Sequence, residues 1–245
     1  MPQQPLILLL RPHPVEIGSL SEAGIVAAIP VLRVVPNQEA LREILERLDE
    51  CDWLVLTSPR APRMLRSIRE HLLDATRRGL RLAVVGPRTA ERLRAELGLE
   101  PSLVPESYTG ASLAEELVKK HKPGCVLLAR SEKATPELLQ VLQRSGIRYY
   151  EIPLYRVEKV EKLTDTAARI ADDFDYVVFT SPSVAEAFFS KYHGEPGFTP
   201  VAIGPTTARK LVQLGIKNPL VPSTYTLEGI AELITRHWAS KGADK

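Results

Sequence analysis

The sequence contains very little cysteine, with only Cys51 and Cys125 among 245 residues. Their wide separation matches neither a metal-binding nor a redox motif, in which cysteines lie a few residues apart. Both border apolar runs of the kind that form buried strands. We therefore predict two buried free thiols and, with them, a reducing compartment.

Long hydrophobic runs and a strong charge excess are also absent. The apolar run Leu6–Leu10 is too short to cross a membrane and follows no basic segment, so it predicts a strand rather than a signal peptide. The formal net charge of +2 is too small to indicate nucleic-acid binding. These absences predict a cytoplasmic protein that contacts neither a membrane nor nucleic acid.

Motifs for cofactors and metals are missing as well. The chain has no glycine-rich phosphate loop of either common pattern, and its five histidines are scattered without metal-ligand spacing. No acidic cluster suggests a divalent cation. An enzyme built on this chain is therefore expected to use no metal and no cofactor, and to rely on hydroxyls, backbone amides and a few arginines.

The sequence does contain an internal duplication. Ile29–Val34 (IPVLRV) returns about half the chain later as Ile152–Val157 (IPLYRV). Three more pairs follow in the same order: Thr57–Pro59 with Thr180–Pro182, Val85–Ala90 with Ile203–Ala208, and Val104–Thr109 with Val221–Thr226. Ordered pairs of this kind indicate two similar halves, each long enough to bury its own core.

Within each half, short apolar runs alternate with amphipathic segments. Trp53–Leu56 is a predicted strand, Pro59–Leu73 a helix and Leu82–Val85 the next strand. Such alternation predicts parallel sheets covered by helices on both faces. The expected fold class is therefore α/β, with two similar, flavodoxin-like parallel-sheet lobes.

The repeated IPxxRV segments allow two topologies. If each half were contiguous, they would be internal strands, and one linker near residues 122–124 would join the halves. However, Pro30 and Pro153 cannot donate to a sheet ladder, which favours exposed connectors that cross between the lobes and pair antiparallel. The predicted limits are then 1–34 plus 158–245 for lobe A, 35–151 for lobe B, and about 29–36 and 150–158 for the connectors.

The TSP and GPxTA motifs each follow a predicted strand and open a helix. Ligands of parallel α/β sheets bind at the carboxyl ends of the strands, and helix starts attract anions. The candidates for binding a carboxylate or phosphate are therefore Thr57, Ser58, Thr89, Ser181, Thr206 and Thr207. Ordinary helix capping would also explain each turn taken singly.

Three arginines and a tyrosine complete the candidates. Arg11 and Arg130 end corresponding strands and Arg60 follows the first TSP, so each could hold a carboxylate with two hydrogen bonds or simply face solvent. Tyr155 stands where the first connector has Leu32. On an exposed connector its phenol could donate a proton to a leaving group, the alternative being a packing role.

These motifs together resemble the uroporphyrinogen-III synthase family over essentially the whole chain. The segments that carry the resemblance are LTSPRA (56–61), VVGPRTA (84–90), IPLYRV (152–157), FTSPSVAEAF (179–188) and AIGPTTARKL (202–211). The resemblance implies two α/β lobes joined by a two-stranded ladder, with the first lobe discontinuous. It also implies cofactor-free cyclisation of hydroxymethylbilane to uroporphyrinogen III, with loss of water and inversion of the terminal pyrrole ring.

The resemblance also implies roles for individual residues. Tyr155 would be the acid that assists loss of the hydroxyl, and the substrate would be bound by Ser58, Arg60, Thr89, Ser181, Thr206 and Thr207. Every pyrrole of this substrate carries an acetate and a propionate, a polyanion that suits walls of helix starts. The expected protein is a monomer that could contact neighbouring pathway enzymes transiently.

Two other classes of function stay open at this point. A non-catalytic two-lobe sensor of a polyanionic small molecule would be expected to carry an appended DNA-binding or signalling module. An α/β enzyme acting on phosphates or nucleotides would be expected to carry a glycine-rich loop or metal-binding carboxylates.

Overall fold

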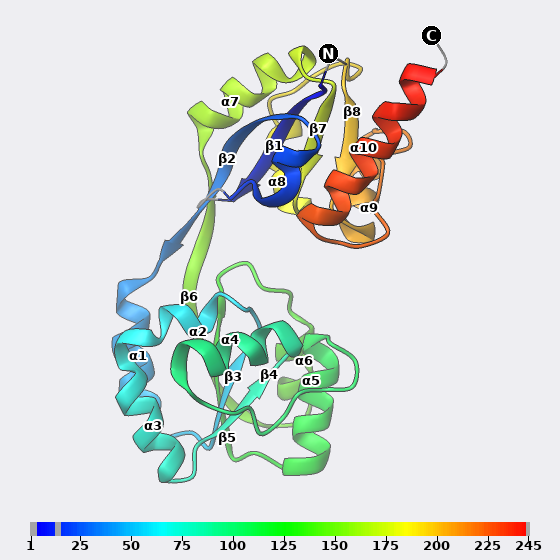
Figure 1. Ribbon diagram of the computed structural model, residues 1–245. Helices are drawn as coiled ribbons and strands as arrows, with labels where there is room; N and C mark the ends of the chain where they lie inside the picture. The colour runs from blue at the N-terminus through cyan, green and yellow to red at the C-terminus, as the bar shows by residue number, and fades with distance from the viewer. Residues whose placement is uncertain (1–3, 13–15, 244–245) are drawn as a thin grey trace. The chain divides into compact units, whose positions relative to one another are not determined.

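The chain divides into two compact units in the computed structural model, which describes residues 4–12 and 16–243 (Figure 1). Unit 1 takes residues 1–34 and 158–245, and unit 2 takes residues 35–157. The strands are β1 (Leu6–Pro12), β2 (Ile25–Pro36), β3 (Trp53–Leu56), β4 (Arg81–Val84), β5 (Cys125–Ser131), β6 (Arg148–Lys159), β7 (Tyr176–Phe179) and β8 (Thr199–Ala202).

Helices connect these strands. The α-helices are α1 (Gln38–Arg47), α2 (Ala61–Met64), α3 (Arg69–Arg77), α4 (Pro87–Leu97), α5 (Gly110–Glu116), α6 (Glu137–Arg144), α7 (Glu161–Ile170), α8 (Pro182–Phe189), α9 (Pro205–Gln213) and α10 (Leu227–Ala243). Short 3₁₀ turns cover Gly18–Glu22, Arg66–Ile68 and Ala171–Asp173, and a π-helical turn covers Leu117–His121.

The strand order repeats from one unit to the other. It reads β4-β3-β5-β6-β2-β1-β7-β8, so that β3, β4 and β5 of unit 2 correspond to β7, β8 and β1 of unit 1. The pairs of β3 with β4 and β5, and of β1 with β2 and β7, are parallel. Isolated bridges at Leu103 and Leu220 extend each set by one position. The predicted fold class, two similar parallel-sheet lobes, is confirmed.

Each unit has its own hydrophobic core. In unit 2, the fully buried Trp53 and Val126 pack with Leu113 of α5 and Leu142 of α6. In unit 1, Ile7 and Tyr176 of the sheet pack with Ile230 and Ile234 of α10. Burying such side chains contributes about 1.5–3 kcal/mol each, so each unit carries a substantial hydrophobic core.

The prediction that the proline-bearing segments are exposed connectors rather than core strands is wrong. β2 and β6 pair in parallel with β1 and β5, and most of their residues are at least partly buried. Pro30 lies opposite Arg11 and Pro153 opposite Arg130, and a register shift follows directly in each case. Bulges are among the few places where a strand tolerates proline, which explains how both segments stay in their sheets.

Two backbone hydrogen bonds bear on the predicted antiparallel connector. Val160 donates to the Val31 carbonyl at 2.9 Å in unit 1, and Asn37 donates to the Leu154 carbonyl at 2.8 Å in unit 2. Residue numbers rise along one segment while they fall along the other, as they do in antiparallel neighbours. The bonds support the antiparallel pairing, which stays a prediction.

The single helix predicted over Pro59–Leu73 is also wrong. The chain forms the four-residue α2, a 3₁₀ turn and then α3. The break falls at Leu65, whose ψ of 0° lies outside the helical range and whose N–H is shared between Ala61 and Pro62 carbonyls. The first TSP motif therefore opens only one helical turn.

The two cysteines are not free thiols, which corrects the prediction from their spacing. Cys51 precedes β3 and Cys125 opens β5, and the pairing of these strands brings the two Cα atoms to 4.5 Å, where a disulfide joins them. Both residues are buried, as predicted. The inference of a reducing compartment loses its support, because it rested on free thiols.

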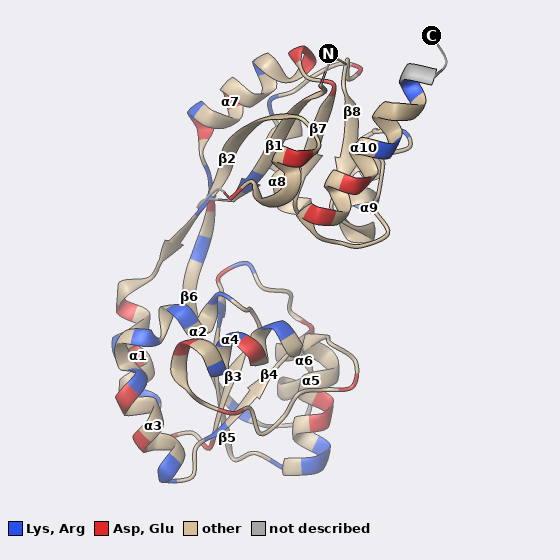
Figure 2. Cartoon of the chain, in the orientation of Figure 1, with Lys and Arg blue, Asp and Glu red and all other residues tan. Residues whose placement is uncertain are grey.

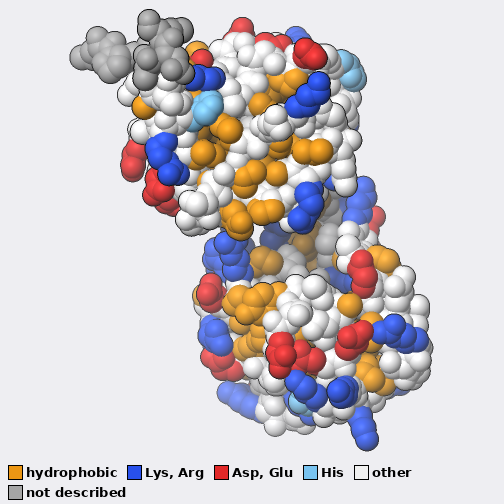
Figure 3. Space-filling model, turned by 90° about the vertical axis from the view of Figure 1, so that its right-hand side faces the viewer, with side chains coloured by type: hydrophobic (Ala, Val, Ile, Leu, Met, Phe, Trp, Pro, Cys, Tyr) orange, Lys and Arg blue, Asp and Glu red, His pale blue; other side chains and the backbone are white. Residues whose placement is uncertain are grey.

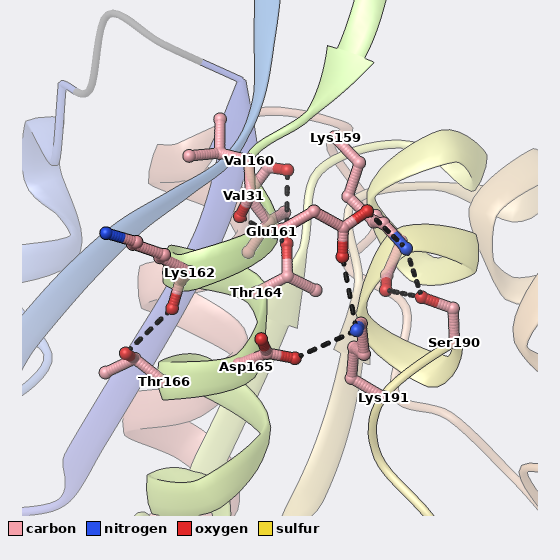
Figure 4. A network of polar contacts seen from close by, with 11 residues as sticks. Val31, Lys159, Val160, Glu161, Lys162, Thr164, Asp165, Thr166, Ser190 and Lys191 are labelled. Carbon is pink, nitrogen blue, oxygen red and sulfur yellow. Dashed lines mark hydrogen bonds and ion pairs between the residues drawn. The ribbon is translucent and has the colours of Figure 1, made fainter.

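Unit 1 holds a network of ion pairs where β6 leads into α7 (Figure 4). Glu161 accepts from Lys159 at 3.0 Å and from Lys191 at 3.2 Å, and Lys191 also pairs with Asp165. The hydrogen bonds from the two lysines lower the pKa of Glu161. The network ties the first turn of α7 to the end of α8.

No helix in the described ranges is long and apolar enough to span a bilayer.

Stability of unit 1 should depend on the protonation of His237. Burial, with a smaller effect of Lys241, lowers its pKa from the ordinary 6.5, and its Nδ1 lies 2.7 Å from the Tyr176 hydroxyl. Burial also raises the pKa of Tyr176 to about 12, so the phenol stays protonated and can donate to Nδ1 of a neutral imidazole whose proton is on Nε2. Below pH 6.5, the unfolded state binds the extra proton more readily than the folded state does.

We therefore expect the free energy of unfolding to fall as the pH drops from about 7 to about 5, and to fall less in His237→Gln. Urea unfolding at both pH values measures the difference, with the exposed His193→Gln as control. Equal pH dependence in wild type and His237→Gln would contradict the assignment.

Candidate active site

The candidate residues of unit 2 collect at one edge of its sheet. Because β3, β4 and β5 run parallel, their carboxyl ends lie together. Thr57 and Ser58 follow β3, and Thr89 follows β4 by way of the Gly86 turn. Arg130 lies near the end of β5. This is the edge at which α/β sheets bind ligands.

Tyr155 and Ser58 are joined by a hydrogen bond at this edge. The Tyr155 hydroxyl donates to Ser58 Oγ at 2.9 Å, and Ser58 Oγ also accepts from the Arg60 backbone N–H at 3.2 Å. The bulge in β6 places Tyr155 opposite Ser131, at the last position of β5. Tyr155 is only 4% exposed, which corrects the prediction of an exposed side chain on a crossing strand.

Arg130 does not face solvent, which was one of the two alternatives predicted for it. Its side chain is 4% exposed, and Nε lies 2.7 Å from Glu151 Oε1 on β6. A second nitrogen donates to the Ala134 carbonyl at 3.2 Å. The guanidinium therefore joins β5 to β6 beneath the edge and holds the loop after β5.

Arg11, the counterpart of Arg130 in unit 1, has a different environment. It is partly buried and donates to the Glu16 carbonyl, and its Nε, like that of Arg130, is buried without a well-aligned hydrogen bond to any described residue. Both strands therefore end in an arginine, but only Arg130 has a carboxylate partner among the residues that the structure describes.

The two GPxTA helices begin in the same way. Gly86 and Gly204 are extended N-cap residues without a side-chain cap, and a proline follows each. Thr89 and Thr207 stand three residues after the caps and are each 3% exposed. Within the described residues no hydrogen bond is recorded for either threonine hydroxyl. Each helix thus begins without a side-chain cap and carries a largely buried threonine in its first turn, a suitable place for an anion.

The remaining hydroxyls of unit 1 are already engaged. Ser181 caps α8 by accepting from the Val184 N–H at 3.3 Å, and Thr206 accepts from Arg209 at 3.3 Å. Both follow the carboxyl ends of β7 and β8, which pair in parallel. Ser181 therefore has the capping role expected of a plain helix start, and binding a ligand would be additional.

Positive charge at the edge is concentrated in unit 2. Arg60 and Arg88 are exposed, and Figure 2 shows basic residues on α2 and α4. The corresponding positions of unit 1 hold the neutral Ser183 and Thr206. Arg88 was not among the predicted binding residues, although its place in the GPRTA motif was visible. Elsewhere both signs are mixed, as on the face of each unit in Figure 3.

A metal has no apparent place in the described part of the chain. No group of three or more histidine, cysteine, aspartate or glutamate side chains is arranged to hold one. The groups available for chemistry at the edges are a phenol, several hydroxyls, backbone amides and arginines.

Comparison with known proteins identifies relatives across most of the chain. The family described as "Uroporphyrinogen-III synthase HemD" matches residues 19–232. A Methanothermobacter thermautotrophicus protein is 33% identical over 223 residues, 85% of each chain. A Methanocaldococcus jannaschii protein is 29% identical over 216 residues, 84% of this chain and 85% of its own. Both are named "Putative uroporphyrinogen-III synthase".

Solved structures share the fold. A mutant uroporphyrinogen III synthase from Thermus thermophilus superposes with a TM-score of 0.70 at 20% identity, covering 96% of this chain and 99% of its own. The uroporphyrinogen-III synthetase of Helicobacter pylori gives 0.66 at 18% identity, covering 96% and 100%.

The Arg130–Glu151 pair should matter more for stability than a surface pair. We expect Glu151→Gln to lower the free energy of unfolding by about 1–3 kcal/mol, because it leaves a buried guanidinium without its carboxylate. Glu151 itself is 34% exposed, which keeps the loss below that of a fully buried pair. Glu100→Gln, which breaks the exposed Arg94–Glu100 pair, is the control and should cost less than about 1 kcal/mol. Urea unfolding measures both, and equal losses would contradict this role of Arg130.

Proposed function

The chain belongs to the uroporphyrinogen-III synthase family, and from this premise we propose that it converts hydroxymethylbilane into uroporphyrinogen III. The reaction is a cofactor-independent cyclisation in tetrapyrrole biosynthesis. Water leaves the terminal hydroxymethyl group, the last pyrrole ring is inverted, and the ring closes. The observation that carries this proposal is the family match over residues 19–232, which includes both copies of the repeated edge motifs.

The edges suit the charge of this substrate. Hydroxymethylbilane carries an acetate and a propionate on each of its four pyrroles. The uncapped starts of α4 and α9, with Thr89 and Thr207, offer backbone donors to carboxylates, and exposed Arg60 adds positive charge. A helix start contributes about 0.3–1 kcal/mol to an exposed anion, so several together are needed to hold the substrate.

The Tyr155–Ser58 contact supplies a route for a proton. Because Tyr155 is nearly buried and donates to Ser58, its proton would reach the substrate through the serine hydroxyl. Ser58 would give its own proton to the leaving hydroxyl and take the one from Tyr155. The carbon–oxygen bond then breaks, water departs, and the cationic methylene carbon is attacked by the terminal pyrrole ring.

Binding should contribute more than the acid does. The substrate closes spontaneously without inversion, so the enzyme has to impose the conformation in which the last ring turns over. Arg11, Thr57, Arg130, Ser181 and Thr206 are proposed to help in this binding. For Arg130 the contribution would be indirect, through the loop after β5 that it holds.

The setting of the reaction is part of the proposal. The family acts on a small molecule, and we propose a monomer in the cytoplasm, independent of membranes and nucleic acid. The substrate's tendency to close spontaneously would favour transient contact with neighbouring pathway enzymes.

The direct test is an isomer assay. Purified protein is incubated with enzymatically generated hydroxymethylbilane, the products are oxidised, and the porphyrin isomers are separated. We expect mainly the type III isomer, and type I alone in the control without protein. Type I alone in both would refute the proposed function, and tight binding without type III product would favour the sensor.

Tyr155→Phe should lower kcat by about 10- to 100-fold, because it removes the proton while keeping the ring. Ser58→Ala should have a similar effect if the proton passes through the serine. Tyr150→Phe is the matched control, since this tyrosine lies on the same strand with its hydroxyl bonded to Glu50, away from the carboxyl edge. Unchanged turnover in Tyr155→Phe, with intact folding by circular dichroism, would remove it as the acid.

A further inference from the structure

An exposed tyrosine stands beside the GPxTA turn in each unit. Tyr108 is 63% exposed and Tyr225 is 53% exposed, although both belong to repeated segments of the sequence. Single exposed aromatic residues are common on protein surfaces and need no explanation. Two exposed tyrosines at equivalent positions of a duplicated edge are more informative, because the residues directly before them, Glu106 and Ser107, are replaced by Ser223 and Thr224 in the other half.

The backbone holds both tyrosines in the same way. Upstream, Leu103 and Leu220 bridge to β4 and β8 and accept hydrogen bonds at 3.0 Å and 2.8 Å. Downstream, the next residue of each tyrosine is a threonine N-cap: Thr109 accepts from Ser112 and Thr226 from Gly229, both at 3.1 Å. Each tyrosine thus lies in a short segment that is held by a β-bridge at one end and by a capped helix start at the other.

Each ring lies against the glycine that caps the neighbouring helix. A Cβ added to Gly86 would lie 3.5 Å from Tyr108 Cβ and 3.6 Å from its Cγ. A Cβ added to Gly204 would lie only 3.3 Å from Tyr225 Cγ, so that position has no room for a larger residue unless the ring shifts. The glycine therefore lets the ring approach the helix start, next to Thr89 in unit 2 and Thr207 in unit 1.

The exposure of the two tyrosines is unusual for residues that directly precede an N-cap. A hydrophobic residue just before an N-cap commonly packs onto the first turn of its own helix. Here the residues that such packing would cover, Leu113 and Ile230, are fully buried, yet the tyrosines remain more than half exposed. One side of each ring is against a glycine, and much of the remainder is open to solvent.

We propose that Tyr108 and Tyr225 are substrate-binding residues that pack their rings against pyrrole rings of the tetrapyrrole. The proposal rests on the proposed function and adds to it a contact for the ring system. Helix starts and arginines can bind carboxylates but leave the flat, electron-rich pyrroles without a partner. An aromatic ring beside each uncapped helix start provides one, in the way that aromatic side chains stack on nucleobases.

The experiment distinguishes the contribution of the aromatic ring to binding from that of the hydroxyl. Tyr108→Ala and Tyr225→Ala are compared with Tyr108→Phe and Tyr225→Phe, and Val212→Ala, a 58% exposed apolar residue later in α9, is the control. Binding of uroporphyrinogen III, kept reduced under anaerobic conditions, is measured by calorimetry, and KM and kcat by the isomer assay. Circular dichroism and the urea midpoint confirm that each variant folds.

We expect each alanine variant to raise the Kd and KM at least about fivefold, and the phenylalanine variants and Val212→Ala to stay within about twofold of wild type. Alanine variants that bind as tightly as wild type would overturn the proposal. Phenylalanine variants as weak as the alanine ones would also overturn it, because the hydroxyl rather than the ring would then be responsible.

Failure of the proposed function gives a different result. If wild type binds uroporphyrinogen III but forms only the type I isomer, the synthase activity is refuted, and the Kd values still decide the role of the tyrosines. If wild type neither binds uroporphyrinogen III nor forms the type III isomer, both proposals are overturned.

Discussion

Parallel pairing of short buried strands is the constraint on which the candidate site depends. When β3 pairs in parallel with β4 and β5, every strand end that carries a turn motif is brought to one edge. β1, β7 and β8 do the same in unit 1. The motifs lie far apart in the sequence, and no local preference would gather them. Their position at a common edge follows from strand direction alone. The same strand direction places several helix starts at that edge, where α/β sheets bind ligands.

The duplication gives each unit the same kind of edge, but the charged side chains at the two edges differ. Both units have the uncapped glycine, the buried threonine and the exposed tyrosine in the same arrangement. Charge differs, because Arg60 and Arg88 of unit 2 correspond to neutral residues of unit 1. The shared features are those that a repeated substrate, with similar rings and carboxylates along its length, would require in two places.

The sequence predicted the features that arise from repetition and from periodicity. The strands, the helix that stops at Gly98 and the common edge could be read from apolar runs and paired motifs, and Gly98 does adopt the left-handed conformation at a helix end. The features that depend on packing were not visible. The disulfide required knowing that β3 and β5 are neighbours, which the separation of Cys51 from Cys125 does not reveal. Similarly, the burial of Arg130 depends on Glu151, which comes from another strand.

The prolines show how a sound local rule can mislead. Pro30 and Pro153 cannot donate to a ladder, yet each sits just before a bulge that removes the need for that hydrogen bond.

The bulge has a further consequence, since it determines which side chain comes next to the strand end. In unit 2 this is Tyr155, opposite Ser131, and in unit 1 it is Leu32, opposite Pro12. Both side chains are buried, but only the phenol can donate a hydrogen bond, and its acceptor is a serine that caps no long helix. Among the described residues, the matching Ser181 has no phenol partner, and its hydroxyl caps α8. Only the edge of unit 2 therefore pairs a phenol with a serine hydroxyl, which is why we assign the proposed proton transfer, and with it the single leaving group, to that copy.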